Sequence, residues 1–289
     1  MDWNKISKEI SRHSVVCVGE STHGSHEFFA SKVALFKNLV TNHGFNTFMI
    51  EDESKRCEEI NEYIDTGEGN ALELIGSLYK VWVRQELLNL IKWLREIHTD
   101  FNVKFVGFDI VQNKQNIHKR EVFMANNILT YKQVNPKSKI FIWTHNYHAK
   151  KWSSNKNVTP MGKILSKALG GEYFSVAQYF GLGEISVTLI NKSNPSSKDR
   201  TLHTLSVEGV IPHSLESSLN SISDRAYFLN QKSFSEYDLC KNYVSRSIGW
   251  GVYADELGEY TDITNVFREF DGIFFFPVTS PSREVIPIR

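Results

Sequence analysis

The sequence predicts an α/β fold with a mostly parallel central sheet and helices on both of its faces. Two observations support this prediction: short apolar runs alternate with amphipathic stretches of helical period, and several of the runs end in a polar residue. Open parallel sheets bind ligands at the carboxyl ends of their strands. The 289 residues are 41% hydrophobic and show no break in composition, so we expect a single α/β domain over residues 1–289.

The N-terminal part reads as a strand, a loop, a helix and a second strand. Residues 15–18 are β-branched or thiol side chains without a polar residue, as in a strand buried on both faces. After the next loop, apolar side chains recur at helical spacing until Gly44 supplies a stop signal. The second predicted strand, residues 45–50, runs directly into the acidic triplet 51–53.

The middle of the chain repeats this alternation. An amphipathic pattern predicts a helix over residues 84–98, and the apolar run 103–108, which ends at Asp109, predicts a third strand. A helix near residues 116–129 leads into a fourth strand over residues 139–143. Four strands of one parallel sheet would therefore place their polar ends at a common edge.

The C-terminal third is less regular. Residues 173–179 predict a fifth strand, and the apolar run 272–278 predicts a last strand that needs two covered faces. Weaker patterns predict strands at residues 185–191 and 226–229, while the polar stretch 192–204 predicts a surface connection. We therefore expect mixed strands at the C-terminal side of the sheet.

Charge and cysteine content narrow the class of function. Lys and Arg total 33, as do Asp and Glu, and no basic stripe is present, so a nucleic-acid partner is not expected. The three cysteines form no CxxC pair, which favours a reducing compartment, and we expect a cytoplasmic protein. No apolar run approaches the roughly 20 residues that cross a bilayer, so no membrane partner is expected. Nucleotide-binding glycine motifs and a G-x-S-x-G elbow are also absent from the sequence.

The loop after the first strand contains an acid, a base and the start of a helix. Residues 19–24 read GESTHG, and the N-terminus of the following helix can stabilise an anion. An imidazole titrates near neutral pH, so His23 could activate a water molecule while Glu20 orients it. The alternative is that Ser21 and Thr22 only cap the helix and that His23 packs against the backbone.

The loop after the fourth strand, residues 144–148, carries two imidazoles three positions apart. This spacing suits contacts to an oxyanion or shared coordination of a metal ion, and the alternative is a pair of surface histidines. A parallel sheet would bring this loop to His23. A catalytic divalent metal is possible on this basis, although no HExxH signature is present; its ligands would come from Glu20, His23, Glu51, Asp109, His145 and His148.

Two segments resemble sequence motifs of a known family. Residues 18–29, VGESTHGSHEFF, resemble the opening motif of the erythromycin esterase family, and residues 143–148, WTHNYH, are similar to its Trp-x-His-Asn-x-His segment. The resemblance extends over most of the chain and is strongest between residues 14 and 180. Further similar positions are Lys32, Glu51, 93–95, 106–109 and 271–277.

The resemblance implies hydrolysis of a carboxylic ester or lactone by a histidine-activated water, without a covalent intermediate and without a required metal. It implies His23 as the general base. It also implies Glu20 and Glu51 as the carboxylates that arrange the base and the water, and His145 and His148 as donors near the developing oxyanion. We further expect four residues to contact the substrate: Thr22, Lys32, Arg84 and Asp109.

The sequence departs from the family in one respect. Members that open macrolide rings, and so confer antibiotic resistance, usually carry a long helical insertion before the Trp-x-His-Asn segment, whereas only about 33 residues separate Asp109 from Trp143 here. We therefore expect a short helical lid and an ester smaller than a macrolide. Two alternatives remain at this point: a metal-dependent hydrolase that uses the same residues, and a non-catalytic protein that binds a small ligand.

Overall fold

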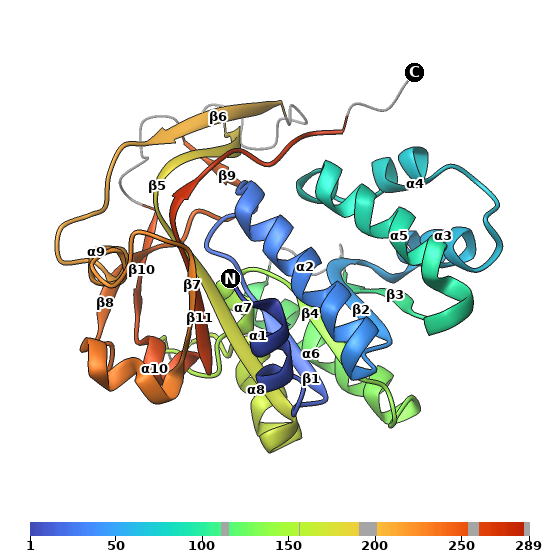
Figure 1. Cartoon of the computed structure of the whole chain (residues 1–289), viewed down its shortest axis with the longest axis horizontal. Helices are drawn as coiled ribbons and strands as arrows, with labels where there is room; N and C mark the ends of the chain where they lie inside the picture. Colours follow the sequence, from blue (N-terminus) through green and yellow to red (C-terminus); the bar gives the residue numbers. More distant parts are fainter. Residues whose placement is uncertain (111–115, 156, 191–200, 254–259, 286–289) are drawn as a thin grey trace.

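A twisted sheet runs through the middle of the molecule with helices on both faces (Figure 1). The computed structural model describes residues 1–110, 116–155, 157–190, 201–253 and 260–285. The main path of the sheet has the strand order β3-β2-β4-β1-β5-β11-β7. The order β2-β4-β1 shows that the chain leaves and re-enters the middle of the sheet through crossovers, as in doubly wound α/β folds.

Six strands of this path run parallel and β7 runs antiparallel at one edge. The parallel strands are β1 (Val15–Val18), β2 (Thr47–Glu53), β3 (Lys104–Asp109), β4 (Ile140–Trp143), β5 (Tyr173–Leu189) and β11 (Gly272–Thr279), and the antiparallel edge strand is β7 (Tyr227–Asn230). The distal half of β5 also pairs with β6 (Leu202–Val207) and β9 (Gly251–Val252), while β8 (Tyr243–Arg246) and β10 (Thr261–Thr264) form a separate antiparallel pair.

The helices divide between the two faces, each over its own apolar cluster. One face is covered by α1 (Trp3–Ile10), α2 (His26–His43), α3 (Ser54–Thr66), α4 (Ala71–Ser77) and α5 (Gln85–Phe101). The other is covered by α6 (Ile117–Val134), α7 (Asn146–Ala149), α8 (Met161–Leu169), α9 (Leu215–Asn220) and α10 (Val266–Glu269). Short 3-10 helices are η1 (Lys80–Trp82), η3 (Gly170–Glu172) and η4 (Gln231–Tyr237).

Strand β1 shows why two clusters form. Val16 and Val18 belong to the cluster under α2, whereas Val15 and Cys17 belong to the cluster under α6, because alternate side chains of a strand point to opposite faces. All four side chains are fully buried. A strand in this position must be apolar throughout, which is what the sequence showed.

The predicted parallel sheet with helices on both faces and mixed C-terminal strands is confirmed, with two local corrections. Residues 185–189 do not form a separate strand but continue β5 beyond Gly183, whose φ of 120° and close approach to the carbonyl of Thr279 exclude a side chain. Residues 202–207, predicted in part as a surface connection, form β6; residues 191–200 lie outside the described part of the chain. No helix in the described part is long and apolar enough to span a membrane.

Candidate active site

The loops that follow the neighbouring strands β1 and β4 lie against each other. A Cβ on Gly19 would lie 2.5 Å from Oδ1 and 2.8 Å from Cα of Asn146, so only glycine permits this approach. The backbone N–H of Asn146 donates to the carbonyl of Glu20 at 2.8 Å, and its side-chain amide donates to the carbonyl of Gln178 on β5 at 3.0 Å. These contacts fix both imidazole-bearing loops to the middle of the sheet.

His23 is oriented by the carboxylate of Glu20. Nδ1 of His23 lies 2.6 Å from Oε1 of Glu20, which also accepts the indole N–H of Trp143 at 3.2 Å. Since the carboxylate accepts from Nδ1, the neutral imidazole keeps its lone pair on Nε2. Within the described residues the structure shows no hydrogen bond at Nε2, and the His23 side chain lines a pocket. The ring is therefore in the tautomer that can accept a proton from a bound water.

Glu20 and Lys32 form a fully buried ion pair beneath His23. Burial by itself raises the pKa of Glu20, but the charge of Lys32 and the hydrogen bond from His23 outweigh burial and lower that pKa from its ordinary value. Burial lowers the pKa of Lys32 to about 8, although the charge of Glu20 opposes this shift. The Glu20 carboxylate is ionised at neutral pH and can stabilise a positive charge on His23.

Glu51 is a second carboxylate at the strand ends. Its Oε1 lies 2.6 Å from Nη2 of Arg120, and its Oε2 accepts hydrogen bonds from the hydroxyl of Thr144 at 2.6 Å and from the backbone N–H of His145 at 3.3 Å. Arg120 also contacts Asp109 at 2.8 Å. One guanidinium therefore bridges Glu51, near the end of β2, and Asp109, at the end of β3, and Glu51 in turn holds the loop after β4.

His148 lies between two carboxylates. Its Nδ1 is 2.5 Å from Oε1 of Glu121, and its Nε2 is 3.4 Å from Oε1 of Glu51. Burial lowers the pKa of His148, but the charges of Glu121 and Glu51 outweigh burial and raise it to about 10. Burial raises the pKa of Glu51, but the charges of His148 and Arg120 outweigh it and hold that pKa well below its ordinary value. The 3.3 Å contact between His148 Nε2 and Arg120 is consequently not a hydrogen bond, since an imidazolium has no lone pair to accept it.

His145 has the opposite electrostatic character. Its ring centroid lies 5.5 Å from that of His23, and its Nδ1 accepts the backbone N–H of Tyr147 at 3.2 Å. Burial, followed by the charges of His23 and His148, places the pKa of His145 well below its ordinary value. The neutral ring thus carries its proton on Nε2, which is buried. The Ser21 backbone carbonyl lies near enough to this N–H to raise the pKa of His145 slightly, but it makes no hydrogen bond of normal geometry with it.

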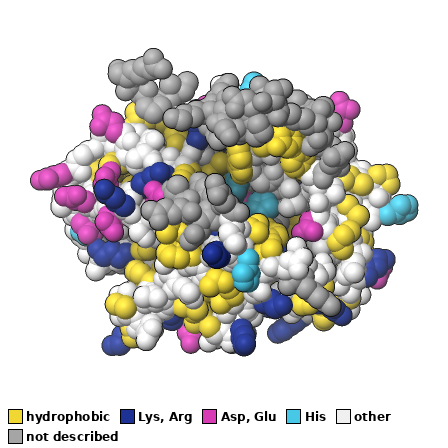
Figure 2. Space-filling view, turned by 180° about the vertical axis from the view of Figure 1, so that it is seen from behind, with side chains coloured by type: hydrophobic (Ala, Val, Ile, Leu, Met, Phe, Trp, Pro, Cys, Tyr) yellow, Lys and Arg dark blue, Asp and Glu magenta, His cyan; other side chains and the backbone are white. Residues whose placement is uncertain are grey.

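These groups surround a pocket of about 610 Å³, a size typical of small-molecule sites. Its lining residues are His23, Glu51, Tyr79, Lys80, Val81, Trp82, Ile117, Arg120, His145, Tyr147, His148, Ser247, Gly249 and Trp250. Figure 2 shows histidine side chains near the middle of one face of the molecule, beside hydrophobic side chains. The pocket joins lining residues between positions 23 and 148 to the segment before β9.

The family model described as erythromycin esterase matches residues 40–119 and 111–279 of the chain. The chain belongs to the erythromycin esterase family. A curated relative, the erythromycin esterase type II of Escherichia coli, is 32% identical over 114 residues, which cover 39% of this chain and 27% of the relative. The aligned part is therefore well under two thirds of the length of that relative.

Solved structures of erythromycin esterase-like fold resemble the chain over nearly its full length. A succinoglycan biosynthesis protein superimposes with a TM-score of 0.81 at 19% identity and covers 96% of this chain and 91% of its own. A Bacillus cereus protein gives 0.73 at 17% identity, covering 99% and 100%. An erythromycin esterase mutant in its open conformation gives 0.71 at 14% identity, covering 99% and 96%. At these identities the likeness concerns the fold.

The five residues predicted to be catalytic in this family member are brought together by the structure. Four of them line the pocket, and Glu20 lies directly behind His23. Both ring nitrogens of His148 are turned towards carboxylates, and its role as a donor to the oxyanion stays a prediction. His145 is the imidazole with an N–H to offer.

The four residues predicted to contact the substrate do not line the pocket. Lys32 pairs with Glu20 behind it, and Asp109 pairs with Arg120. Thr22 accepts the backbone N–H of Gly24 at 3.2 Å. Arg84 is buried and donates to the Ser282 hydroxyl and to the carbonyls of Lys80 and Val83, so its role is to fix η1.

Several residues of the site were not predicted from the sequence. Arg120 and Glu121 lie near the start of α6, and Tyr147 supplies an aromatic wall. The sequence contained one signal for the first two residues. Arg120 and Glu121 form a charged pair about one turn after the start of the helix that follows the strand ending at Asp109. The segment between β3 and β4 is mainly α6, which packs on the sheet through Met124, Ala125 and Ile128, and its first turn borders the pocket.

The carboxylates that could bind a metal ion in this pocket are already paired with side-chain cations. Glu20 is paired with Lys32, while Glu51 and Asp109 share Arg120. Among the described residues no three His, Cys, Asp or Glu side chains gather in a way that could hold a metal ion. A divalent ion at this position would have to displace these side-chain cations.

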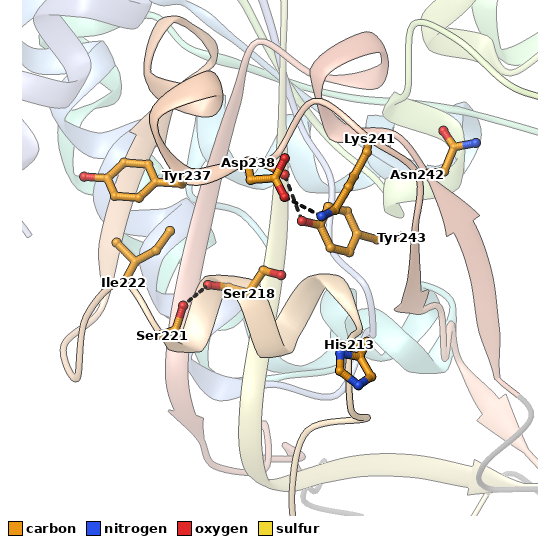
Figure 3. Close-up of a pocket in the computed structure, with 9 residues that line it drawn as sticks. All are labelled: His213, Ser218, Ser221, Ile222, Tyr237, Asp238, Lys241, Asn242 and Tyr243. Carbon is orange, nitrogen blue, oxygen red and sulfur yellow. Dashed lines mark hydrogen bonds and ion pairs between the residues drawn. The ribbon is translucent and has the colours of Figure 1, made fainter.

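A second hollow, of about 480 Å³, lies in the C-terminal third (Figure 3). Its lining residues are His213, Ser218, Ser221, Ile222, Tyr237, Asp238, Lys241, Asn242 and Tyr243. The charged side chains Asp238 and Lys241 are exposed and pair with each other, and the hydroxyl of Tyr243 donates to the carbonyl of Asp238. It contains none of the imidazoles at the strand ends, so the first pocket is the candidate active site.

Proposed function

We propose that the protein hydrolyses a carboxylic ester or lactone with a water molecule that His23 activates. The observation that carries the proposal is the Glu20–His23 pair, which leaves Nε2 of His23 as the lone-pair nitrogen at the pocket, 5.5 Å ring to ring from the N–H-bearing His145. Buried titratable groups in this density are costly in a site that only binds, which favours hydrolysis over a non-catalytic binding role.

The residues divide the reaction into three tasks. Nε2 of His23 takes a proton from water, and the resulting hydroxide attacks the carbonyl carbon. Nε2–H of His145 donates to the oxygen that becomes negative in the tetrahedral intermediate. As the intermediate collapses, the bond to the alcohol oxygen breaks, and the imidazolium of His23 returns its proton to that oxygen. The products are a carboxylic acid and an alcohol.

The carboxylates support these steps without bonding to the substrate carbon. Glu20 holds the required tautomer of His23 and stabilises its positive charge. Glu51 lines the pocket and can accept a hydrogen bond from the second O–H of the attacking water, while Arg120 and His148 keep it ionised. We propose a metal-independent reaction, because side-chain cations already fill the positions that a metal ion would take.

The relative from Escherichia coli is described as an erythromycin esterase, but we propose a smaller ester for this chain. The first turn of α6, rather than a long helical insertion, borders the pocket. We also propose a cytoplasmic setting, since all three cysteines are free thiols.

The test is turnover of a panel of carboxylic esters and small lactones by the purified protein, with and without a chelator. We expect His23→Ala to lose about three orders of magnitude in kcat/KM, and chelation to have no effect. His203→Ala, on an exposed residue of β6, is the matched control and should behave as wild type. Hydrolysis that persists in His23→Ala contradicts the mechanism, and loss of activity on chelation that zinc restores favours a metal-dependent hydrolase.

A further inference from the structure

Aromatic side chains from three separate parts of the chain form the walls of the pocket. Tyr79 and Trp82 come from η1 and the residue before it, Tyr147 comes from α7, and Trp250 precedes β9. Trp82 meets the ring of His23 edge-on, with 5.1 Å between centroids. A substrate group bound between these walls would therefore lie directly beside the proposed base.

Each of the two tyrosine rings has a cation over one face. Nζ of Lys150 lies 4.8 Å from the Tyr147 centroid and is held by Asp262 at 3.0 Å. The guanidinium carbon of Arg56 lies 4.8 Å from the Tyr79 centroid and pairs with the acidic end of β2. Neither cation lines the pocket. Lys150 and Arg56 therefore contact these two rings from outside the pocket lining.

This arrangement disfavours a positively charged ligand. A cation binds an aromatic face through the ring quadrupole, whose faces are partially negative, and a ring that already holds a cation on one side attracts a second one less strongly. Tyr147 and Tyr79 are therefore better suited to contact an uncharged, apolar surface than a cation.

The cations that do line the pocket are already paired. Among the described lining residues, Arg120 bridges Glu51 and Asp109, and His148 lies between Glu121 and the same Glu51. Lys80 lies 3.3 Å from Glu284. Glu51, which is ionised, would repel a negative substituent near the pocket floor. An anionic ligand would have to break one of these pairs to find a partner.

Building on the proposed function, we infer that the substrate is an uncharged ester in which a ring with a flat apolar face adjoins the ester group. Either an aromatic ring or the apolar face of a sugar ring satisfies this chemistry. The pocket volume of about 610 Å³ admits such a ring together with the ester. Tyr147 and Tyr79 would determine this specificity by stacking on the ring.

The test measures binding of acetamides, which place the same groups in the pocket but resist hydrolysis. The probes are acetanilide, its 4-carboxylate and 4-trimethylammonium derivatives, N-hexylacetamide and methyl N-acetylglucosaminide, each titrated by NMR against the wild-type protein. We expect one of the two neutral ring probes to bind about fivefold or more tightly than the charged and open-chain probes. The comparison of acetanilide with the glycoside distinguishes an aromatic ring from a sugar.

Variants assign the preference to the tyrosine walls. Tyr147→Leu should abolish the advantage of the ring probe over N-hexylacetamide, whereas Tyr147→Phe should keep it. Lys150→Met should improve binding of the trimethylammonium probe more than that of acetanilide. Lys80→Gln should leave the ranking of the probes unchanged. Tyr237→Leu, on an exposed tyrosine outside this pocket, is the matched control, and circular dichroism checks that each variant is folded.

Three results would overturn the inference: tightest binding of a charged probe, equal or undetectable binding of all probes, or an equal loss for ring and open-chain probes in Tyr147→Leu. A failure of the proposed function gives a different pattern. In that case the neutral ring probe binds selectively and depends on Tyr147, but the corresponding phenyl or sugar acetate is not hydrolysed.

Discussion

The carboxylate of Glu121 links His148 to the start of α8: its Oε1 lies 2.5 Å from Nδ1 of His148, and its Oε2 accepts the backbone N–H of Met161 at 2.7 Å. Glu121 is fully buried on α6, so one side chain joins three helices behind the pocket. It also fixes the direction in which His148 presents Nε2 to Glu51.

Glu121→Gln should lower the pKa of His148 from its value of about 10, because the first of its two carboxylate partners loses its charge. Because folding raises the pKa of His148, its protonated form stabilises the folded state fully at pH values below the ordinary pKa of 6.5. This contribution is lost as the pH rises towards 10. NMR titration of labelled histidines, together with unfolding at several pH values, measures both effects. Glu172→Gln, on an exposed residue, is the control. An unchanged titration of His148 would contradict the assignment.

Replacement of Lys32 by methionine should destabilise the protein by about 3–5 kcal/mol, because Glu20 would remain buried without a cation. Denaturant unfolding measures the change, and Lys92→Met on the exposed side of α5 should alter stability by less than about 0.5 kcal/mol.

The wild-type protein should also become more stable between pH 8 and 10.5. The pKa of Lys32 falls from 10.5 to about 8 on folding, so the unfolded chain binds more protons in this range and stability from this group rises with pH. A Lys32→Met variant should lack this dependence. If both proteins show the same slope, Lys32 is not the titrating group.

His145 is expected to act as a neutral donor. His145→Gln, which can place an amide N–H in the pocket, should retain much more activity than His145→Leu, for which we expect a loss of about 10²–10³ in kcat. The ester assay of the His23 series provides the measurement. Equal activity of the two variants would show that the N–H of His145 is not used.

Gly19→Ala should disrupt the contact between the two imidazole-bearing loops. The new Cβ would lie within 3 Å of Asn146, including its Cα, so the backbone must move, at a cost of about 1–3 kcal/mol. Gly171→Ala, where no atom lies within 4 Å, is the matched control. Thermal unfolding of both variants tests the difference, and an equal melting temperature would contradict the close approach.

The sequence predicted the sheet and the meeting of its loops because both follow from local patterns. Runs such as Val15–Val18 are apolar throughout only when both faces are covered, and parallel strands bring their carboxyl ends to one edge. The roles of Arg84 and Arg120 could not be read in this way. Both are basic residues near a helix end, and only the tertiary packing decides that one fixes η1 while the other bridges two carboxylates.

The bond between Trp143 and Glu20 joins residues 123 positions apart in the chain. Contacts of such long range form slowly during folding, since a large loop must close before they contribute. An assembled catalytic centre should therefore be a late product of refolding, and recovery of enzymatic turnover should lag behind the return of helical structure. Nascent chains that end before residue 143 contain His23 and Glu20. They lack the indole N–H of Trp143, on β4, that donates to the Glu20 carboxylate.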